Sequence, residues 1–115
     1  MSTTVRDNPA ESRYEILDGE QVVGFATYRL TGGRIAFLHT EVDPAHAGRG
    51  LAGQLVTWAL DDVRRRGLTV LPFCPYVRSF IARHAERYLD LVAPADRARF
   101  ELPADVPEGE RPAGA

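Results

Sequence analysis

A glycine-rich stretch, HAGRGLAGQL at residues 46–55, has the residue types and spacing that most clearly indicate chemistry. Gly48, Gly50 and Gly53 follow the pattern G-x-G-x-x-G. Glycines allow a backbone to approach a ligand closely, and backbone N–H groups that converge at the start of a helix bind anions. A helix that begins near Leu51 would therefore make this loop a diphosphate site.

Two common phosphate-binding motifs do not fit this loop. A dinucleotide-binding fold places its glycines after the first strand of a βαβ unit, with an acidic residue about 20 positions later. Here the next strand ends in Pro72-Phe73-Cys74, which contains no carboxylate. A P-loop requires Lys followed by Ser or Thr, and the chain contains no lysine. The loop therefore indicates a different class of phosphate site.

The composition limits the other functions that the chain can have. Its 115 residues suit one domain, and a net charge of -2 gives no reason to expect a nucleic-acid partner. The single cysteine, Cys74, excludes an internal disulfide, and His39, His46 and His84 lack metal-ligand spacing, so we expect no metal. The absence of a long apolar run and of a signal-peptide pattern predicts a cytoplasmic protein without a membrane partner.

The segment before the loop has the pattern of an antiparallel meander. Tyr14–Leu17 and Gln21–Leu30 are predicted strands joined by an Asp18-Gly19 turn, and Arg34–Val42 is the third strand. Strict alternation would place two sets of side chains on opposite faces of this third strand. One set is Ile35, Phe37, His39 and Glu41, and the other is Ala36, Leu38, Thr40 and Val42.

The segment after the loop alternates between helix and strand. Apolar residues at helical spacing predict an amphipathic helix from about Leu51 to Arg66, which ends at Gly67. Leu68–Phe73 has the composition of a short buried strand, and Pro75 is expected to begin a second helix. Tyr88–Val92 is predicted to be a final short strand.

Both ends of the chain have polar compositions, which predict less order. We expect residues 1–12 to be a disordered segment, residues 13–93 to form the domain, and residues 94–115 to be a mobile tail. The tail is rich in Pro, Ala, Glu, Gly and Arg, a composition with little apolar surface to bury.

The run from His39 to His84, HTEVDPAHAGRGLAGQLVTWALDDVRRRGLTVLPFCPYVRSFIARH, resembles the small, single-domain YjdJ-like members of the Gcn5-related N-acetyltransferase superfamily. The family motif is Arg/Gln-x-x-Gly-x-Gly/Ala, and residues 48–52 match it, with Ala47 in place of the usual Arg or Gln. The resemblance covers Tyr14 to about Val92. It implies a mixed α/β fold of the reduced acyl-CoA N-acyltransferase type. In that fold an antiparallel meander is followed by a parallel strand pair around the CoA-binding helix.

The resemblance also implies acetyl-CoA as the co-substrate and transfer of its acetyl group to a primary amine. The residues expected to bind the cofactor are Val42, Gly48, Arg49, Gly50, Leu51 and Ala52. The superfamily's usual N-terminal helices, which form one wall of the acceptor site, are absent here, so the acceptor cleft should be open. An open cleft suits an amine on a protein or peptide as well as a small molecule, and we expect a monomer or weak dimer.

Such a transfer requires that the acceptor ammonium lose a proton near the acetyl group. Glu41 and His39 are the candidate bases, with Glu41 favoured and a structural role equally open for His39. Cys74 lies where the resembling enzymes separate two strands to admit the thioester. Its thiol could protonate the departing thiolate or carry the acetyl group, or it could be a small buried hydrophobe. Larger relatives use a tyrosine in the following helix as the acid, and Tyr76 is the nearest phenol here.

Two other functions remain open at this point. A CoA-binding module without transferase activity would have the same glycine loop. A thiol-transfer protein that uses Cys74 would need a second thiol from another molecule, because the chain has no other cysteine.

Overall fold

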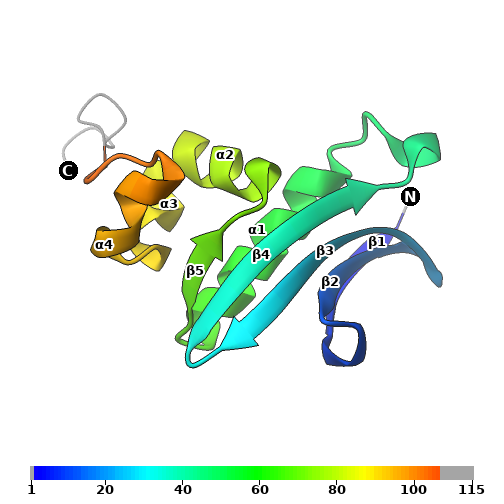
Figure 1. Ribbon diagram of the computed structural model, residues 1–115. Coiled ribbons are helices and arrows are strands. Elements are labelled where there is room, and N and C mark those ends of the chain that lie inside the picture. Colours follow the sequence, from blue (N-terminus) through cyan, green and yellow to red (C-terminus); the bar gives the residue numbers. More distant parts are fainter. Residues whose placement is uncertain (1, 107–115) are drawn as a thin grey trace.

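Five strands form one sheet in which each strand pairs with its neighbours in sequence. The computed structural model describes residues 2–106. The order is β1-β2-β3-β4-β5, with antiparallel pairing up to β4 and parallel pairing between β4 and β5 (Figure 1). The strands are β1 (Thr3–Asn8), β2 (Arg13–Asp18), β3 (Gln21–Thr31), β4 (Arg34–Val42) and β5 (Thr69–Pro72). The predicted meander and the predicted parallel pair are both confirmed.

One long helix, α1, connects β4 to β5 and covers one face of the sheet. It spans Leu51–Arg65, and its apolar residues at i, i+4 and i+8 spacing, such as Leu51, Leu55 and Ala59, are buried against the strands. Because the chain crosses the sheet through α1, β5 runs parallel to β4. Three further helices follow, α2 (Pro75–Arg83), α3 (Ala85–Tyr88) and α4 (Pro94–Arg97).

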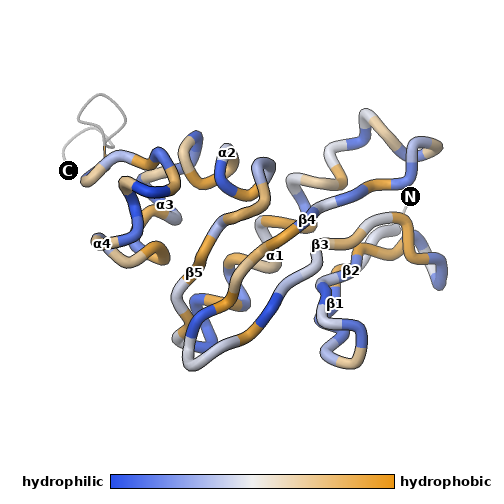
Figure 2. Tube along the Cα trace, viewed as in Figure 1, coloured by the Kyte–Doolittle hydropathy of each residue, from blue (hydrophilic) through white to orange (hydrophobic). Residues whose placement is uncertain are grey.

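The core lies between the sheet and α1, and the other face of the sheet is open. Side chains that point toward α1 are fully buried, including Tyr14, Ile16, Ala26, Ile35, Phe37 and Val70. In Figure 1, α1 lies behind the sheet, and no helix of residues 2–106 lies in front of it. Figure 2 shows hydrophobic and hydrophilic residues interspersed along β3 and α1, as expected for elements with one buried side.

A β-bulge in β4 places the residues that follow it on the face opposite to the one predicted from the sequence. Tyr28 pairs with Phe37 and Thr27 pairs with His39, so Leu38 is an extra residue in β4. A bulge reverses the faces of the residues that follow it. Ile35 and Phe37 are buried, whereas the His39 and Glu41 side chains are 62% and 60% exposed on the open face. The prediction that all four share one face was therefore wrong.

The predicted disorder at the N-terminus was wrong as well. Residues 3–8 form β1, which pairs along its whole length with β2. β1 lacks the apolar pattern of a buried strand, and its side chains instead form polar contacts with β2, β3 and α1. The Arg6 guanidinium donates to Glu15, the Tyr28 hydroxyl donates to Asp7, and the Gln54 amide donates to the Thr3 hydroxyl.

The C-terminal predictions need two corrections. Residues 88–92 are not a strand, because α3 ends at Tyr88 and a 3-10 turn, Leu89–Leu91, follows it. Residues 94–106 are not a mobile tail, since α4 and a second 3-10 turn, Ala98–Phe100, bring Phe100 and Leu102 into the core. The remainder of the predicted tail, residues 107–115, lies outside the described residues.

Candidate active site

The glycine loop leads from β4 into α1 through two left-handed glycines. Gly48 and Gly50 have φ angles of +83° and +71°, a region that side chains rarely adopt. No atom lies within 4 Å of the position that a Cβ would occupy at either glycine. Gly50 is the N-cap of α1, and the first turn of the helix contains no acidic residue. The backbone around both glycines is therefore exposed to open space.

A cavity of about 250 Å³ lies at this loop. Its walls are Val42, His46, Ala47, Gly48, Gly50, Leu51, Ala52, Gly53 and Tyr76. The first N–H groups of a helix have no partner within the helix, and the helix dipole is positive at this end. The cavity can therefore hold an anion such as a pyrophosphate. It includes every predicted cofactor-binding residue except Arg49, whose guanidinium lies 3.2 Å from the His46 Nδ1.

The two parallel strands separate just beyond Phe37. Paired residues of β4 and β5 end at Phe37 and Pro72, and the Cys74 N–H donates to the Phe37 carbonyl at 2.8 Å. Past this point β4 and the chain after β5 diverge (Figure 1). Cys74 lies at the start of the divergence, is 2% exposed, and has its Sγ 3.3 Å from the Thr40 Oγ1. Cys74 therefore lies at the point where the pairing of β4 and β5 ends.

His39 and Glu41 are neighbours on the open face. The His39 Nε2 lies 3.9 Å from the Glu41 Oε1, and the His39 ring is 6.4 Å from the Phe25 ring, centre to centre. Thr40, between them in sequence, points the other way and contacts Cys74. The structure therefore brings His39 to Glu41 and Thr40 to Cys74, and the two pairs lie on opposite sides of β4.

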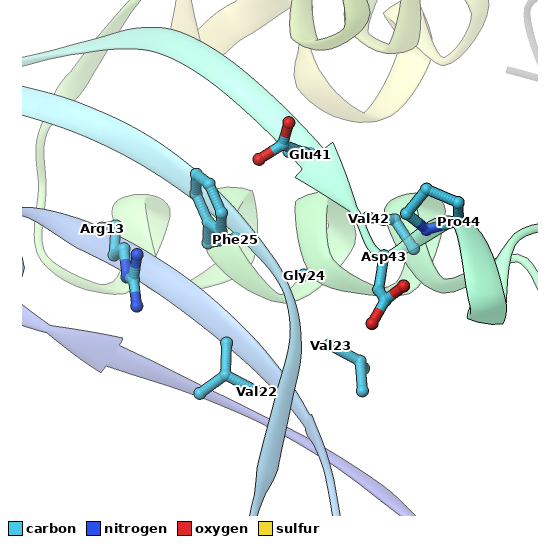
Figure 3. A pocket seen from close by; sticks show the side chains of 9 residues that line it. All are labelled: Arg13, Val22, Val23, Gly24, Phe25, Glu41, Val42, Asp43 and Pro44. Atoms are coloured by element: carbon cyan, nitrogen blue, oxygen red, sulfur yellow. The ribbon is translucent and has the colours of Figure 1, made fainter.

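A larger cavity, of about 520 Å³, opens beside Glu41 (Figure 3). The Glu41 and Asp43 carboxylates and the Phe25 ring contribute to its wall. The other lining residues are Arg13, Val22, Val23, Gly24, Val42 and Pro44. The two carboxylates suit a cationic group such as an alkylammonium. Sequence reasoning missed Phe25 and Asp43, although a Glu41-x-Asp43 pair at a strand end was a readable signal.

The buried Glu15 carboxylate holds Arg13, which lines this cavity, in place. Glu15 is 1% exposed and accepts hydrogen bonds from Arg13 at 2.7 Å, Arg6 at 2.9 Å and Asn8 at 3.2 Å. Burial by itself raises the pKa of Glu15, but these three donors outweigh it and hold the pKa below its usual value. The Arg13 guanidinium is thereby held 4.7 Å above the Phe25 ring.

Tyr76 connects the glycine loop with α2. It lines the cavity at the loop, and its hydroxyl lies 3.7 Å from the position of a Cβ at Gly53. Its ring stacks on Phe80, with 6.2 Å between ring centres. A Cβ at position 53 would therefore make an ordinary van der Waals contact with the phenol. Gly53 lies where α1 and α2 meet.

A family model described as GCN5-related N-acetyl-transferase matches residues 13–91. The match covers more than half of the chain, and the chain belongs to this family. Acetyl-CoA is the co-substrate typical of the family.

Three proteins illustrate what this chain is similar to. Protein NATD1 of Bos taurus is 38% identical over 69 residues, which cover 58% of this chain and 61% of that protein, so the chain spans about three fifths of the curated relative's length. A GCN5-like protein from Staphylococcus aureus, solved by NMR, has a similar fold, with a TM-score of 0.60 and 21% identity over 78% of this chain and 87% of that one. A Mycobacterium tuberculosis protein solved in complex with CoA matches with a TM-score of 0.48 and 25% identity over 64% of this chain and 47% of that one.

Within residues 2–106, no helix has both the length and the apolar character needed to cross a bilayer. The same part of the chain holds no group of three or more His, Cys, Asp or Glu side chains that could bind a metal ion.

Proposed function

We propose that the protein is an acetyl-CoA-dependent N-acetyltransferase that moves an acetyl group to a primary amine of a protein, a peptide or a small molecule. The open cavity over Gly48 and Gly50, at the start of α1, carries this proposal. A site of this shape binds a diphosphate without any lysine, and the chain belongs to a family that uses a diphosphate-containing thioester.

The backbone N–H groups from Gly48 to Ala52 would hold the pyrophosphate of CoA. Val42 and Tyr76 border the same cavity and would contact the pantetheine arm. The arm would extend between the separating strands toward Cys74, so that the thioester lies near Thr40. Arg49 follows Gly48 in the loop, and its guanidinium would add positive charge near the phosphates.

The amine would approach from the opposite side of β4, through the cavity that contains Glu41. Glu41 would accept a proton from the ammonium, and His39 beside it could share that proton. The free nitrogen would then attack the acetyl carbon, so that the C–N bond forms while the C–S bond breaks. The departing thiolate regains a proton, for which Cys74 is the nearest candidate donor, and the proton that the attacking nitrogen loses restores the Cys74 thiol. In a second route the Cys74 sulfur would first take the acetyl group and release CoA as the thiol, and the amine would then attack the acetylated Cys74.

The test combines a binding measurement with a transfer measurement. CoA binding is measured by calorimetry, and release of the CoA thiol from acetyl-CoA is followed with a panel of amines and lysine peptides. We expect saturable CoA binding and thiol release that depends on the acceptor, with one acetyl group found on it by mass spectrometry. CoA binding without transfer to any acceptor would favour the alternative of a CoA-binding module without transferase activity. The absence of CoA binding would refute the proposal.

The thiol-transfer alternative is less compatible with the structure. Cys74 is 2% exposed, and its sulfur contacts the Thr40 hydroxyl in the interior. A thiol that exchanges with another protein must be accessible to the second sulfur. The buried position suits a reaction with a small thioester that enters between the strands.

A further inference from the structure

A second hollow lies on the open face of the sheet, at the other end of the β3–β4 pair. It has a volume of about 310 Å³ and is lined by Arg29, Thr31, Arg34, Ala36, Leu38, Leu71 and Phe73. Leu38 and Phe73 are 43% and 46% exposed, which is unusual for large apolar side chains. The hollow therefore combines an apolar floor with positive charge and contains no acidic side chain.

The two arginines of this hollow have no partner among the described residues. Every other arginine in residues 2–106 forms a hydrogen bond, an ion pair or a ring contact, whereas Arg29 and Arg34 form none of these. Exposed guanidinium groups beside an apolar surface suit a ligand that carries a carboxylate or phosphate next to an apolar group.

The register of the sheet connects this hollow to the cavity at Glu41. Along β3 and β4 the pairs Arg29–Ala36, Thr27–His39 and Phe25–Glu41 follow one another on the open face. We call this surface the acceptor strip, defined by residues 25, 27, 29, 36, 38, 39 and 41. Its two ends carry opposite charge, with unpaired arginines at one end and the Glu41 and Asp43 carboxylates at the other. Because β4 contains the bulge, the span is counted along β3. Leu30, midway between Arg29 and Thr31, the partner of Arg34, is five residues from Phe25, the partner of Glu41, or roughly 16 Å at about 3.3 Å per residue.

We propose that the acceptor strip binds an acidic peptide segment, with the amine to be acetylated at Glu41 and an acidic side chain of the same peptide between Arg29 and Arg34. This inference rests on the proposed function, because it names the class of acceptor that the transferase uses. An extended peptide also rises about 3.3 Å per residue, so the acidic residue lies about five positions from the lysine. An apolar residue beside the acid would contact Leu38 and Phe73.

Six fluorescent ten-residue peptides test the inference. Each has an acceptor lysine, and the residue five positions away, on its N-terminal or its C-terminal side, is Glu, Gln or a second Lys. Binding is measured by fluorescence anisotropy in the presence of CoA. We expect at least one Glu peptide to bind at least tenfold, or about 1.4 kcal/mol, more tightly than its Gln counterpart. The preference should shrink as salt increases, because it depends on exposed charges.

A charge-reversed variant locates the preference. Replacing both Arg29→Glu and Arg34→Glu should abolish the preference for the Glu peptide and favour the Lys peptide, while CoA affinity stays within twofold. The matched control carries Arg83→Glu and Arg87→Glu, which make the same change of charge on α2 and α3, away from the strip. Equal binding of the Glu, Gln and Lys peptides by the natural chain, or an equal loss of preference in the control, would overturn the inference.

Transfer assays on the same peptides separate this inference from the proposed function. A preference for the Glu peptide without acetyl transfer to it or to any acceptor of the amine panel would refute the transferase and leave the strip as a peptide-binding surface. Acetyl transfer at equal kcat/KM to the Glu, Gln and Lys peptides would support the transferase and refute the strip.

Discussion

At the level of single residues, Thr40 and Glu41 separate the two halves of the proposed reaction. Thr40 contacts Cys74 on the side of the diverging strands, and Glu41 faces the large cavity on the open face. Neighbouring residues of a strand point to opposite faces. The bulge at Leu38 is what turns Glu41, and not Thr40, toward the open face. A thioester and an amine could therefore approach one short segment of β4 from its two sides.

Glu41→Gln tests the base. If Glu41 removes the proton, kcat at pH 7 should fall by about 10²-fold or more. Part of the loss should be recovered near pH 10, where over a quarter of a lysine amine, with a pKa of about 10.4, is deprotonated without help, against less than about a thousandth at pH 7. A pH profile of kcat for the natural chain and the variant measures this. A reduction that is the same at every pH would assign Glu41 a role in binding, and an unchanged rate would exclude it as the base.

Cys74→Ala tests the thiol. A role in proton or acetyl transfer predicts a fall in turnover of about 10²-fold or more. A thiol that only lines the channel predicts a change of a few fold, with a modest loss of stability. Mass spectrometry of the natural protein incubated with acetyl-CoA alone distinguishes a proton donor from an acetyl carrier. Only a Cys74 that carries the acetyl group would be found acetylated. Wild-type turnover in the variant, together with no acetylated Cys74, would remove the residue from the mechanism.

At the level of elements, the glycine loop and the start of α1 act as one unit. Gly50→Asp places a side chain and a negative charge in the open space above the N-cap. We expect the Kd for CoA to rise at least tenfold, which is a loss of about 1.4 kcal/mol of binding free energy. Gly33→Asp is the matched control, because Gly33 also has a positive φ, +81°, and nothing within 4 Å of a Cβ, but lies in the β3–β4 turn. Equal CoA affinity for folded Gly50→Asp and the natural chain, measured by calorimetry, would exclude the loop from the site.

The pairing of β1 with β2 should make the protein sensitive to acid. The pKa of Glu15 is lower in the folded chain than its usual value, because three donors outweigh its burial. The carboxylate therefore contributes its full stability above its unfolded pKa of about 4.3, and the contribution is lost as the pH falls toward the folded value. Asp62 changes in the same direction, since hydrogen bonds from Tyr14 and Arg65 outweigh its burial.

Glu15→Gln tests this contribution. The variant should lose about 3 kcal/mol of unfolding free energy at pH 7, as expected when one partner of a buried ion pair is removed. The difference from the natural chain should narrow below pH 4. Urea denaturation at several pH values measures both effects, with Glu20→Gln in the exposed β2–β3 turn as the control. A constant difference between pH 7 and pH 3 would contradict the assignment.

At the level of the whole molecule, the sequence predicted the parts that local patterns determine. Hydrophobic alternation and turn glycines identified β2, β3 and β4, and helical spacing identified α1. The glycine loop and the position of Cys74 beside β4 were also predictable. The bulge at Leu38 was not, because it depends on how Tyr28 and Thr27 pair with β4 and leaves no mark on the alternation itself.

The missed parts are those that contacts distant in sequence stabilise. β1 has a polar sequence, TTVRDN, and its order depends on partners that follow later in the chain, among them Glu15, Tyr28 and Gln54. Residues 94–106 have few apolar side chains, yet Phe100 is 4% exposed because it packs against Phe73. The composition of a segment shows how much apolar surface it has. It does not show whether distant parts of the chain form a site where that surface is buried.

Phe100→Ala tests whether the C-terminal segment is part of the folded unit. The Phe100 ring meets Phe73 edge to face, with centres 5.1 Å apart, and the Arg99 guanidinium lies 4.7 Å above it. Removing a buried phenylalanine costs about 3 kcal/mol, and for a domain of this size such a loss lowers Tm by roughly 10 °C or more. Leu30→Ala is the control, because Leu30 is 46% exposed and should change Tm by only a few degrees. Thermal unfolding followed by circular dichroism measures both. Equal Tm values for Phe100→Ala and the natural chain would show that the segment does not stabilise the fold, whereas the expected decrease would extend the folded unit beyond residue 93.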